Sequence, residues 1–355
     1  MIDLVWNFPL LAEQGADWQG YLRRAVDALH VDDAREMRPS FRGADTGLRE
    51  RAAKWLGVET ERAWISCGGH HGTLMALFAA ELRGLTIAVE EITYSGILDQ
   101  GKMLGCKVVG VAFDGEGMMP ASLRAVCEKE SVAAVFLMPS LHNPLGIVAG
   151  LERRMEIVTV AREFDLLIVE DDAYGFMDVA AAPSYAVLAP ERTFYVRGMS
   201  KSYAPATRTG FMVVPERFVG AMENVLKNTT TGTALAHNMA MMEVIEDGTL
   251  ERVMEAKRVE GARRNKAARV VLGESAMPGA ACAWHLWLSL PEGLSAADAQ
   301  RVCLERGVMV SGAKGFTAPG VEVPRALRIG MGGEVSREVV EEGLGIVAGV
   351  LRGIL

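Results

Sequence analysis

The feature that most constrains the fold of this chain is a series of short, almost continuous apolar runs in its middle. The runs cover residues 86–92, 106–113, 132–139, 166–173, 193–200 and 209–215. Strands that helices cover on both faces have this composition, and amphipathic stretches such as 151–165 separate most of the runs. The alternation predicts an α/β fold with a mostly parallel central sheet between helices. The last run follows its predecessor after a short connection, which also allows an antiparallel strand.

The pattern changes after about residue 216, where longer helices and fewer strands are expected. The expected elements are a charged helical region over 234–272, strands at 282–290, 307–311 and 325–331, a helix at 295–306 and a final helix. This order is typical of a smaller α+β unit, against which the weakly periodic residues 1–40 are expected to pack. We therefore predict a large domain at 43–235 and a small domain formed by 1–42 and 236–355.

Composition excludes several classes of function. The chain has 355 residues, 50% of them hydrophobic, and a net charge of −8 without a basic block, so nucleic acid and anionic membranes are not expected partners. No apolar run approaches the roughly 20 residues needed to span a bilayer, and the start, MIDLVWNFPL, does not resemble a signal peptide. The five cysteines are scattered, without a CxxC pair, which indicates reduced core thiols. Together these observations favour a cytoplasmic protein.

A cluster of glycines, Gly68, Gly69 and Gly72, lies immediately before a predicted helix. Backbone amides at a helix N-terminus attract phosphate, and glycine lets a ligand approach closely, but a tight turn explains the same residues. Their spacing matches neither Walker A nor the dinucleotide fingerprint, which also argues against a nicotinamide-dependent dehydrogenase. The adjacent His70 and His71 point in different directions, and no HExxH or cysteine cluster accompanies them, so we expect no metal.

Other polar or aromatic side chains follow the apolar runs, and each allows a structural as well as a functional interpretation. The acidic stretch 170–172 lies where open α/β sheets bind ligands, although one carboxylate there could simply cap the next helix. A turn explains Asn143, and a lid over the core explains Tyr94. Lys201 and Arg208 stand between two apolar runs, where a lysine is usually solvated unless burial lowers its pKa for covalent chemistry.

The order of these signals along the chain resembles the class I/II aminotransferases, the fold type I enzymes of pyridoxal 5′-phosphate (PLP). The resemblance covers nearly the whole chain. It is closest to the branch of kynurenine/α-aminoadipate-type aminotransferases and of the aminotransferase-like domain of MocR-type regulators. Its most specific motifs are EDD-x-Y, here Glu170 to Tyr174, and SK-x-x-AP-x-x-R-x-G, here Ser200 to Gly210. The resemblance therefore implies the PLP-dependent transferase fold type I.

The resemblance also implies a role for each of these side chains. Lys201 would hold PLP as the internal aldimine and then act as the general base, and Asp171 would pair with the pyridine nitrogen. Asn143 and Tyr174 would bind the phenolic oxygen of the ring, and Tyr94 would stack on its face. The phosphate ligands that the resemblance implies are Gly69, His70, Ser200 and Arg208.

Arg328, in ALRIGMGG, matches the family arginine that binds the substrate α-carboxylate, and Asn143 would be a second substrate contact. Three positions depart from the family's pattern. Gly198 stands where many members have a serine or threonine that contacts the phosphate, and His70 replaces a common glutamine or threonine. Phe41 stands where a tyrosine of the neighbouring subunit often reaches the phosphate. These departures predict weaker anchoring of the phosphate.

The function that the resemblance implies is transfer of the amino group of an amino acid to a 2-oxo acid by a ping-pong mechanism. A homodimer with its active site at the interface is implied as well. β-Elimination, decarboxylation and racemisation use the same residues and stay open. A MocR-like PLP-binding sensor also stays open, although the chain starts directly at its WNFP segment without a helix-turn-helix domain, which argues against DNA binding. The amino donor is not predicted; segments 6–8 and 313–320 are candidate walls of its pocket.

Overall fold

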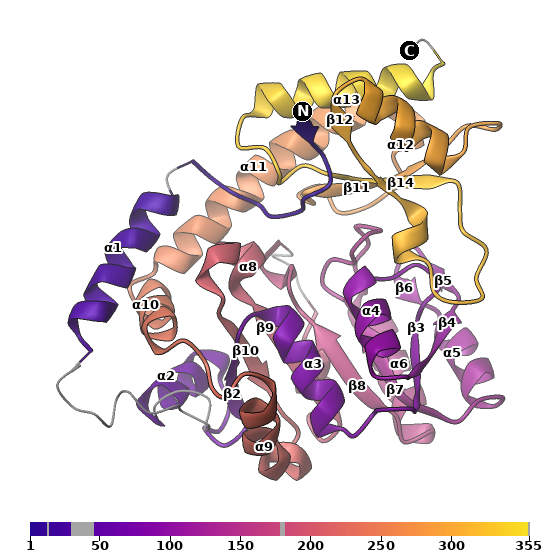
Figure 1. Cartoon of the computed structure of the whole chain (residues 1–355). Helices are drawn as coiled ribbons and strands as arrows, with labels where there is room; N and C mark the ends of the chain where they lie inside the picture. The colour runs from indigo at the N-terminus through magenta and orange to yellow at the C-terminus, as the bar shows by residue number, and fades with distance from the viewer. Residues whose placement is uncertain (13, 30–45, 178–181, 354–355) are drawn as a thin grey trace.

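A seven-stranded sheet forms the centre of the part of the molecule that is lower in Figure 1. The computed structural model describes residues 1–12, 14–29, 46–177 and 182–353. The strands, in their order across the sheet, are β2 (Ala63–Ser66), β10 (Gly210–Val213), β9 (Thr193–Gly198), β8 (Leu167–Asp171), β7 (Val132–Leu137), β3 (Thr86–Glu90) and β4 (Lys107–Val111). β10 is antiparallel to both of its neighbours, and the remaining pairs are parallel.

Helices cover both faces of this sheet, as the apolar runs predict. Every residue of β8 and of β10 is buried, which requires cover on both sides. One face packs against α3 (Gly69–Ala79), α4 (Ser95–Met103), α9 (Val219–Thr229) and α10 (Leu235–Glu246). The other face packs against α5 (Pro120–Cys127), α6 (Leu151–Glu163) and α7 (Tyr185–Leu188). The helix α2 (Thr46–Leu56) packs against β2 and α10.

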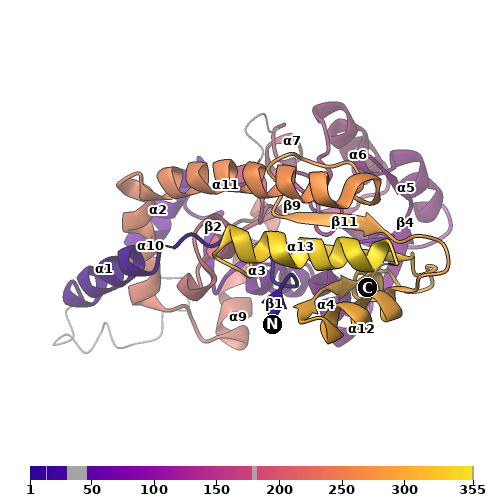
Figure 2. The ribbon, with the colours of Figure 1, turned by 90° about the horizontal axis from the view of Figure 1, so that it is seen from above.

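A second, smaller core lies above the large sheet in Figure 1. Its antiparallel sheet has the order β11 (His285–Ser289), β14 (Ala326–Gly330), β13 (Ser311–Gly312), and β1 (Ile2–Asp3) pairs in parallel with β12 (Val308–Met309). The helices of this core are α11 (Thr249–Leu272), α12 (Ala296–Glu305) and α13 (Arg337–Leu351), and α11 and α13 lie side by side in Figure 2. The N-terminal helix α1 (Gln14–Asp27) packs on α10.

The predicted strands and helices are present, but several details differ. The predicted strand 307–311 is divided into β12 and β13, which belong to separate sheets. The helical region 234–272 is two helices, because Gly248, with a φ of 79°, breaks it between α10 and α11. The strand β2 was not predicted, since it is only four residues long and polar residues precede it. All five cysteines are free thiols, as expected, but only Cys303 among them is buried, and the other four are partly exposed. The domain division at 42 and 235 stays a prediction, and its first boundary lies outside the described residues.

Membrane insertion finds no support in the described residues, where no helix combines the length and the apolar character that crossing a bilayer requires.

Candidate active site

The topology of the large sheet gathers the predicted site residues at one edge. The chain passes from β3 outward to β4 and returns on the other side of β3 as β7, so β3 and β7 mark the switch point where such sheets bind ligands. Tyr94, Asn143 and Asp171 follow or end β3, β7 and β8, and Lys201 follows β9. Because β10 is antiparallel, Arg208, which stands two residues before its first residue, lies at this same edge.

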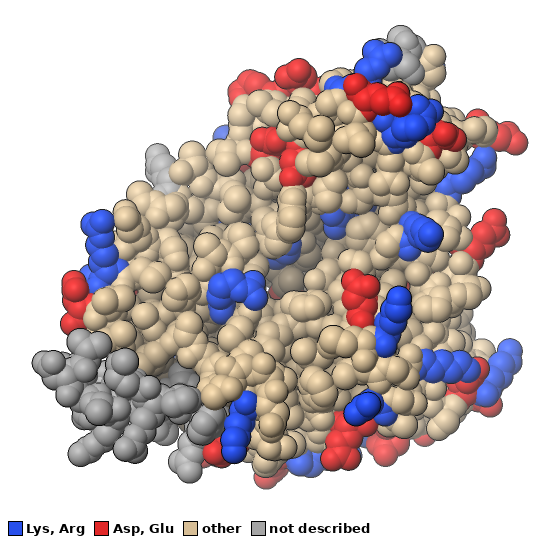
Figure 3. Space-filling view, viewed as in Figure 1, with Lys and Arg blue, Asp and Glu red and all other residues tan. Residues whose placement is uncertain are grey.

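A cavity of about 150 Å³ opens at this edge. Its walls are formed by Phe8, Gly68, Gly69, His70, Tyr94, Met138, Asn143, Asp171, Ala173, Tyr174, Gly198, Ser200, Lys201 and Arg208. All the residues predicted to bind the cofactor are in this set, and Arg328 contacts it through Asn143. Figure 3 shows a hollow on this face, between the upper and lower parts of the molecule, with basic atoms in its depth.

Lys201 lies in the short helix α8 (Met199–Ser202), which begins directly after β9. Its Nζ donates a hydrogen bond to the backbone oxygen of Asn7, 2.5 Å away, and lies 3.4 Å from the centre of the Phe8 ring. Burial, reinforced by the positive charge of Arg328, lowers the pKa of Lys201 to about 7. A large fraction of the amine is therefore uncharged near neutral pH, which is the state that attacks a carbonyl carbon.

Asp171 is the one member of the acidic stretch 170–172 that lines the cavity. Alternation along the strand turns its two neighbours to the opposite face, where Glu170 accepts a bond from the backbone of α7 and Asp172 accepts one from the Tyr195 hydroxyl, 2.5 Å away. Burial raises the pKa of Asp171 to about 7. A cationic group bound in the cavity would hold this side chain as a carboxylate.

Gly69 and His70 line the cavity and form the start of α3, where backbone amides have no partner within the helix. A Cβ atom on Gly198 would lie 2.8 Å from the nitrogen of Gly69, so glycine there allows the end of β9 to approach the start of α3. Gly72 serves packing instead, since a Cβ there would lie 2.7 Å from Val196. The three glycines of the cluster therefore differ in role: Gly68 forms a turn, Gly72 allows close packing, and Gly69 lines the cavity. This arrangement can bind an anion.

Ser200 and Arg208 complete the basic, donor-rich end of the cavity. One guanidinium nitrogen of Arg208 donates to the backbone oxygen of Cys67, 2.8 Å away. The backbone of Arg208 has a φ of 49°, a left-handed conformation that costs a residue with a Cβ about 1–2 kcal/mol. The fold therefore holds this arginine in an unfavourable backbone conformation that aims its side chain at the cavity.

Arg328 binds Asn143 from β14. Its Nη1 donates to Asn143 Oδ1 at 3.2 Å, and its Nη2 donates to the backbone oxygen of Val5. With Oδ1 engaged by the arginine, the amide nitrogen of Asn143 is the group left to donate into the cavity that it lines. The guanidinium carbon also lies 4.8 Å from the centre of the Phe316 ring, so part of the candidate segment 313–320 does contact the site.

His71 does not line the cavity, although it is adjacent to His70 in the sequence. His71 is buried, accepts a bond from the backbone nitrogen of Cys67 and pairs with Thr229, so it stabilises the turn. Within the described ranges no group of three His, Cys, Asp or Glu side chains is arranged to hold a metal ion. Phe41 lies outside the described residues.

The sequence named segment 6–8 as a candidate wall of the substrate pocket, and Phe8 lines the cavity, but the contacts of Val5 and Asn7 and the position of His285 were not predicted. Val5 and Asn7 offer their carbonyl oxygens to Arg328 and Lys201, and Phe8 lies against the amine. A usable signal was the group of three glycines within residues 330–333. A Cβ on Gly330 would lie 2.9 Å from the oxygen of Trp6, and one on Gly332 would lie 2.6 Å from the backbone of Phe8. Clustered glycines often mark such a close approach of two backbones. For the buried side chains of Asn7 and His285 no local pattern exists.

The comparisons with known proteins agree with this geometry. The sequence model of the family "Aminotransferase class I and II" matches residues 15–347, so the chain belongs to that family. It is 26% identical over 345 residues to the uncharacterized HTH-type transcriptional regulator YdeF of Bacillus subtilis, covering 95% of this chain and 74% of that protein. It is 27% identical over 322 residues to the 2-aminoadipate transaminase of Thermus thermophilus, covering 87% of this chain and 80% of that enzyme.

Solved structures show the same fold over the whole chain. The α-aminoadipate aminotransferase LysN of Thermus thermophilus, complexed with N-(5′-phosphopyridoxyl)-L-leucine, superposes with a TM-score of 0.89 at 24% identity, covering 100% of this chain and 92% of that one. An archaeal alanine:glyoxylate aminotransferase also gives 0.89, at 21% identity, with coverage of 100% and 91%. The fold is therefore the fold type I of the PLP-dependent aminotransferases.

The family implies PLP, and the residues around the cavity fit this molecule. Its phosphate matches the end formed by the α3 amides, Ser200 and Arg208, and its aldehyde matches an amine whose pKa is lowered to about 7. Its ring nitrogen, a base, matches Asp171, a buried carboxyl group that lines the cavity and whose pKa is raised by burial.

Proposed function

We propose that this chain is a PLP-dependent aminotransferase that moves the amino group of an amino acid to a 2-oxo acid in two half-reactions. The observation that carries the proposal is the meeting of four groups at one cavity. The pKa of Lys201 is lowered to about 7, and the carboxyl group of Asp171 is buried. The backbone conformation of Arg208 directs its side chain to the cavity, and Arg328 is hydrogen-bonded to Asn143 in the cavity wall. Each matches one chemical requirement of the reaction.

The cofactor, when bound, supplies an electron-withdrawing ring that makes the Cα–H bond of an amino acid acidic. The protein supplies the rest. Lys201, which is half neutral near pH 7, removes and returns the proton at the substrate Cα, and Asp171 holds a proton on the ring nitrogen. Asn143 and Tyr174 donate hydrogen bonds to the phenolic oxygen. Arg328 binds the substrate α-carboxylate, for which it exchanges its bond to the oxygen of Val5.

The amide and guanidinium groups at the other end hold the phosphate. Gly69 and His70 contribute backbone N–H groups, Ser200 its hydroxyl, and Arg208 a charged donor. We further propose that the protein is a homodimer with its active site at the interface and acts in the cytoplasm. Sedimentation at nanomolar to micromolar concentrations tests the dimer, and a fully active monomer would contradict it.

A second function is favoured by one observation, the similarity to YdeF over 95% of this chain. In this alternative the cavity binds PLP and senses an amino acid without completing a transfer. Elimination, decarboxylation and racemisation are further alternatives, because they need the same lysine and aspartate. The products, and not the binding of an amino acid, distinguish these functions.

The experiment loads the purified protein with PLP and presents a panel of amino acids in single turnover, beginning with 2-aminoadipate and kynurenine. We expect one 2-oxo acid per active site and, when a second 2-oxo acid is then added, conversion of that second acid to its own amino acid. Borohydride should fix the cofactor to Lys201, as found by peptide mass spectrometry, and Lys201→Ala should bind PLP without turnover. A spectral response without release of a 2-oxo acid would favour the sensor. Release of ammonia, CO2 or the other enantiomer would identify one of the other reactions.

A further inference from the structure

A buried chain of hydrogen bonds runs from the turn after β7 to the wall of the active site. The backbone oxygen of His142 lies 2.9 Å from His285 Nε2, and His285 Nδ1 lies 2.8 Å from Asn7 Nδ2. The same Nδ2 lies 2.8 Å from the hydroxyl of Tyr174. His285 is 0% exposed, Asn7 4% and Tyr174 3%, so water does not compete for these bonds. The reaction described above assigns no role to Asn7 or to the His285 ring.

The protons in this chain can be assigned from its first member. A carbonyl oxygen only accepts hydrogen bonds, so His285 Nε2 must carry a proton and donate it to His142. Burial lowers the pKa of His285 to about 3, and hence the ring is neutral and carries that one proton. His285 Nδ1 is therefore an acceptor. It follows that Asn7 must present its NH2 group to the ring, because its amide oxygen would face a lone pair.

The orientation of the Asn7 amide in turn decides what the Tyr174 hydroxyl can do. Since Asn7 donates to the hydroxyl oxygen, the hydroxyl proton must point elsewhere. Its one acceptor among the described residues is the backbone oxygen of Asn7, at a long 3.4 Å, and that oxygen already accepts from Lys201 at 2.5 Å. The proton is thus available to an acceptor inside the cavity, which Tyr174 lines.

We propose that Asn7 and His285 are positioning residues that hold Tyr174 as a hydrogen-bond donor toward the phenolic oxygen of the bound cofactor. The proposal rests on the proposed function only in requiring that PLP binds in this cavity. Asn7 Oδ1 has no partner in the described part of the chain, so no competing bond turns the amide the other way. The direction of one hydroxyl proton is thus set by three groups that come from the N-terminus, β11 and the turn after β7.

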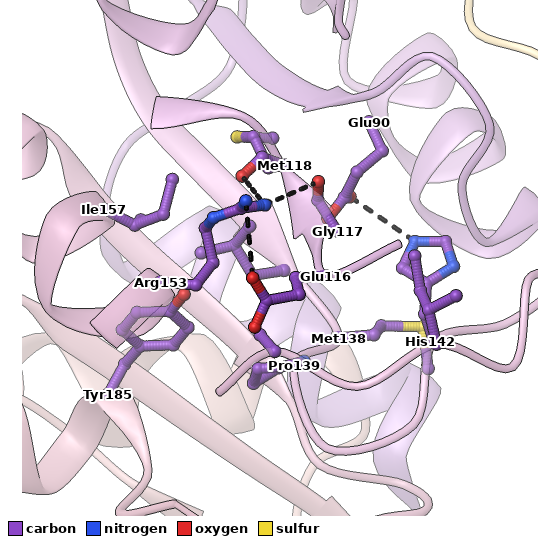
Figure 4. Close-up of a pocket in the computed structure, with 13 residues that line it drawn as sticks. Glu90, Glu116, Gly117, Met118, Met138, Pro139, His142, Arg153, Ile157 and Tyr185 are labelled. Atoms are coloured by element: carbon purple, nitrogen blue, oxygen red, sulfur yellow. Dashed lines mark hydrogen bonds and ion pairs between the residues drawn. The ribbon is translucent and has the colours of Figure 1, made fainter. Parts of the chain in front are cut away.

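The His142 carbonyl, on which the assignment depends, is itself fixed. His142 donates its backbone N–H to Ile147 at 2.8 Å, and its oxygen also accepts from the nitrogen of Gly146 at 2.7 Å, which closes a tight turn. Its ring lines a second, separate cavity of about 10 Å³, enough for about one water molecule, and Nε2 lies 3.5 Å from the Glu90 carboxylate. Figure 4 shows the ring turned toward Glu90. The backbone of His142 cannot rotate without losing its two hydrogen bonds.

The sheet that carries His285 also carries the substrate arginine. His285 pairs with Gly330, and Trp287, two residues further along β11, pairs with Arg328. Since side chains two apart share a face of the sheet, His285 and Arg328 both point at the active site. A shift of β11 or β14 would therefore change both the hydrogen bonds that orient Tyr174 and the position of Arg328, which binds the substrate carboxylate.

The physical consequence is measurable in the spectrum of the loaded enzyme. A donor on the phenolic oxygen stabilises its deprotonated form and lowers the pH at which the visible absorbance changes. Asn7→Asp has nearly the same shape but presents only acceptors, so the Tyr174 proton turns toward the new carboxylate. We expect the midpoint of the absorbance change to rise by about one pH unit or more, the equivalent of losing one hydrogen bond to a charged group.

The added negative charge would also raise that midpoint, so the control is a Tyr174→Phe background. There the charge still acts, but no hydroxyl proton exists to be redirected. We expect the shift caused by Asn7→Asp to be at least twofold larger with Tyr174 present than with phenylalanine. Equal shifts in both backgrounds would mean that charge alone acts, and would overturn the proposal.

A second measurement needs no cofactor and does not depend on the activity. In protein labelled with ¹⁵N at its six histidines, the His285 signal, assigned by its loss in His285→Gln, should show a protonated Nε2 and an unprotonated Nδ1. The opposite tautomer would sink the proposal. Failure of amino transfer, by contrast, would count against the proposed function only. The tautomer of His285 and the midpoint of the absorbance change would still test the role of Asn7 and His285.

Discussion

Replacing Gly198 with alanine should destabilise the protein and loosen its hold on the cofactor phosphate. A Cβ on this residue would lie 2.8 Å from the nitrogen and 3.0 Å from the Cα of Gly69. Both neighbours are backbone atoms, so no side-chain rotation relieves the contact. The end of β9 and the start of α3 must separate by about 0.6 Å or more to reach an ordinary contact distance. Overpacking of this kind costs about 1–3 kcal/mol of stability.

The assay is urea unfolding of the cofactor-free protein, with retention of PLP on dialysis as a second readout. We expect the free energy of unfolding to fall by about 1–3 kcal/mol, and retention to weaken because the displaced Gly69 amide faces the phosphate end of the cavity. The matched control is Gly220→Ala in α9, where a new Cβ would meet nothing within 4 Å. This variant should gain about 0.5–1 kcal/mol from higher helix propensity.

Gly198→Ser distinguishes this reasoning from the interpretation made from the sequence, in which glycine here is a lost phosphate ligand. If serine restored a ligand, the variant would retain PLP more tightly than the natural protein. The packing predicts the reverse, the same loss as with alanine. Tighter retention in Gly198→Ser, or an unchanged stability in Gly198→Ala, would refute the steric argument.

Three further predictions concern the cavity. Asp171→Asn should fold normally and lose several orders of magnitude in single-turnover rate, since an amide cannot hold the ring nitrogen protonated; full activity would remove Asp171 from the mechanism. Arg208→Ala should weaken PLP retention by about 1.5–3 kcal/mol, whereas Arg328→Ala should retain PLP and raise KM for amino acids; the opposite pattern would exchange their roles. Because the pKa of Lys201 is lowered to about 7 and its neutral form reacts, the rate of PLP capture should rise about tenfold per pH unit below 7 and level off above it, and a flat stopped-flow profile would contradict this.

The fold followed from the sequence because its determinants are local. The composition of a single run reports whether both faces of a strand are covered, and β8 and β10 are buried throughout as their runs predict. Once the strands are known to be parallel, residues that follow them must meet at one edge, which brought Tyr94, Asn143 and Lys201 together. Their individual roles came from the resemblance to the aminotransferases, since a lone lysine or asparagine at a strand end has several explanations.

The tertiary structure decided what depends on the meeting of distant segments. The register of β8 determined that Asp171, and not Glu170 or Asp172, lines the cavity. The approach of two backbones gave Gly198 a steric role that its residue type does not reveal. Asn7 and His285 are separated by 278 positions, and neither belongs to a local pattern. Periodicity and motifs describe the surroundings of a residue along the chain, whereas a buried hydrogen bond is made by whichever polar groups the packing of separate elements brings within about 3 Å. For that reason the sequence by itself determined the sheet, its binding edge and the residues of its motifs, and only the packing of the N-terminal segment against β11 and β14 decided how their protons are held.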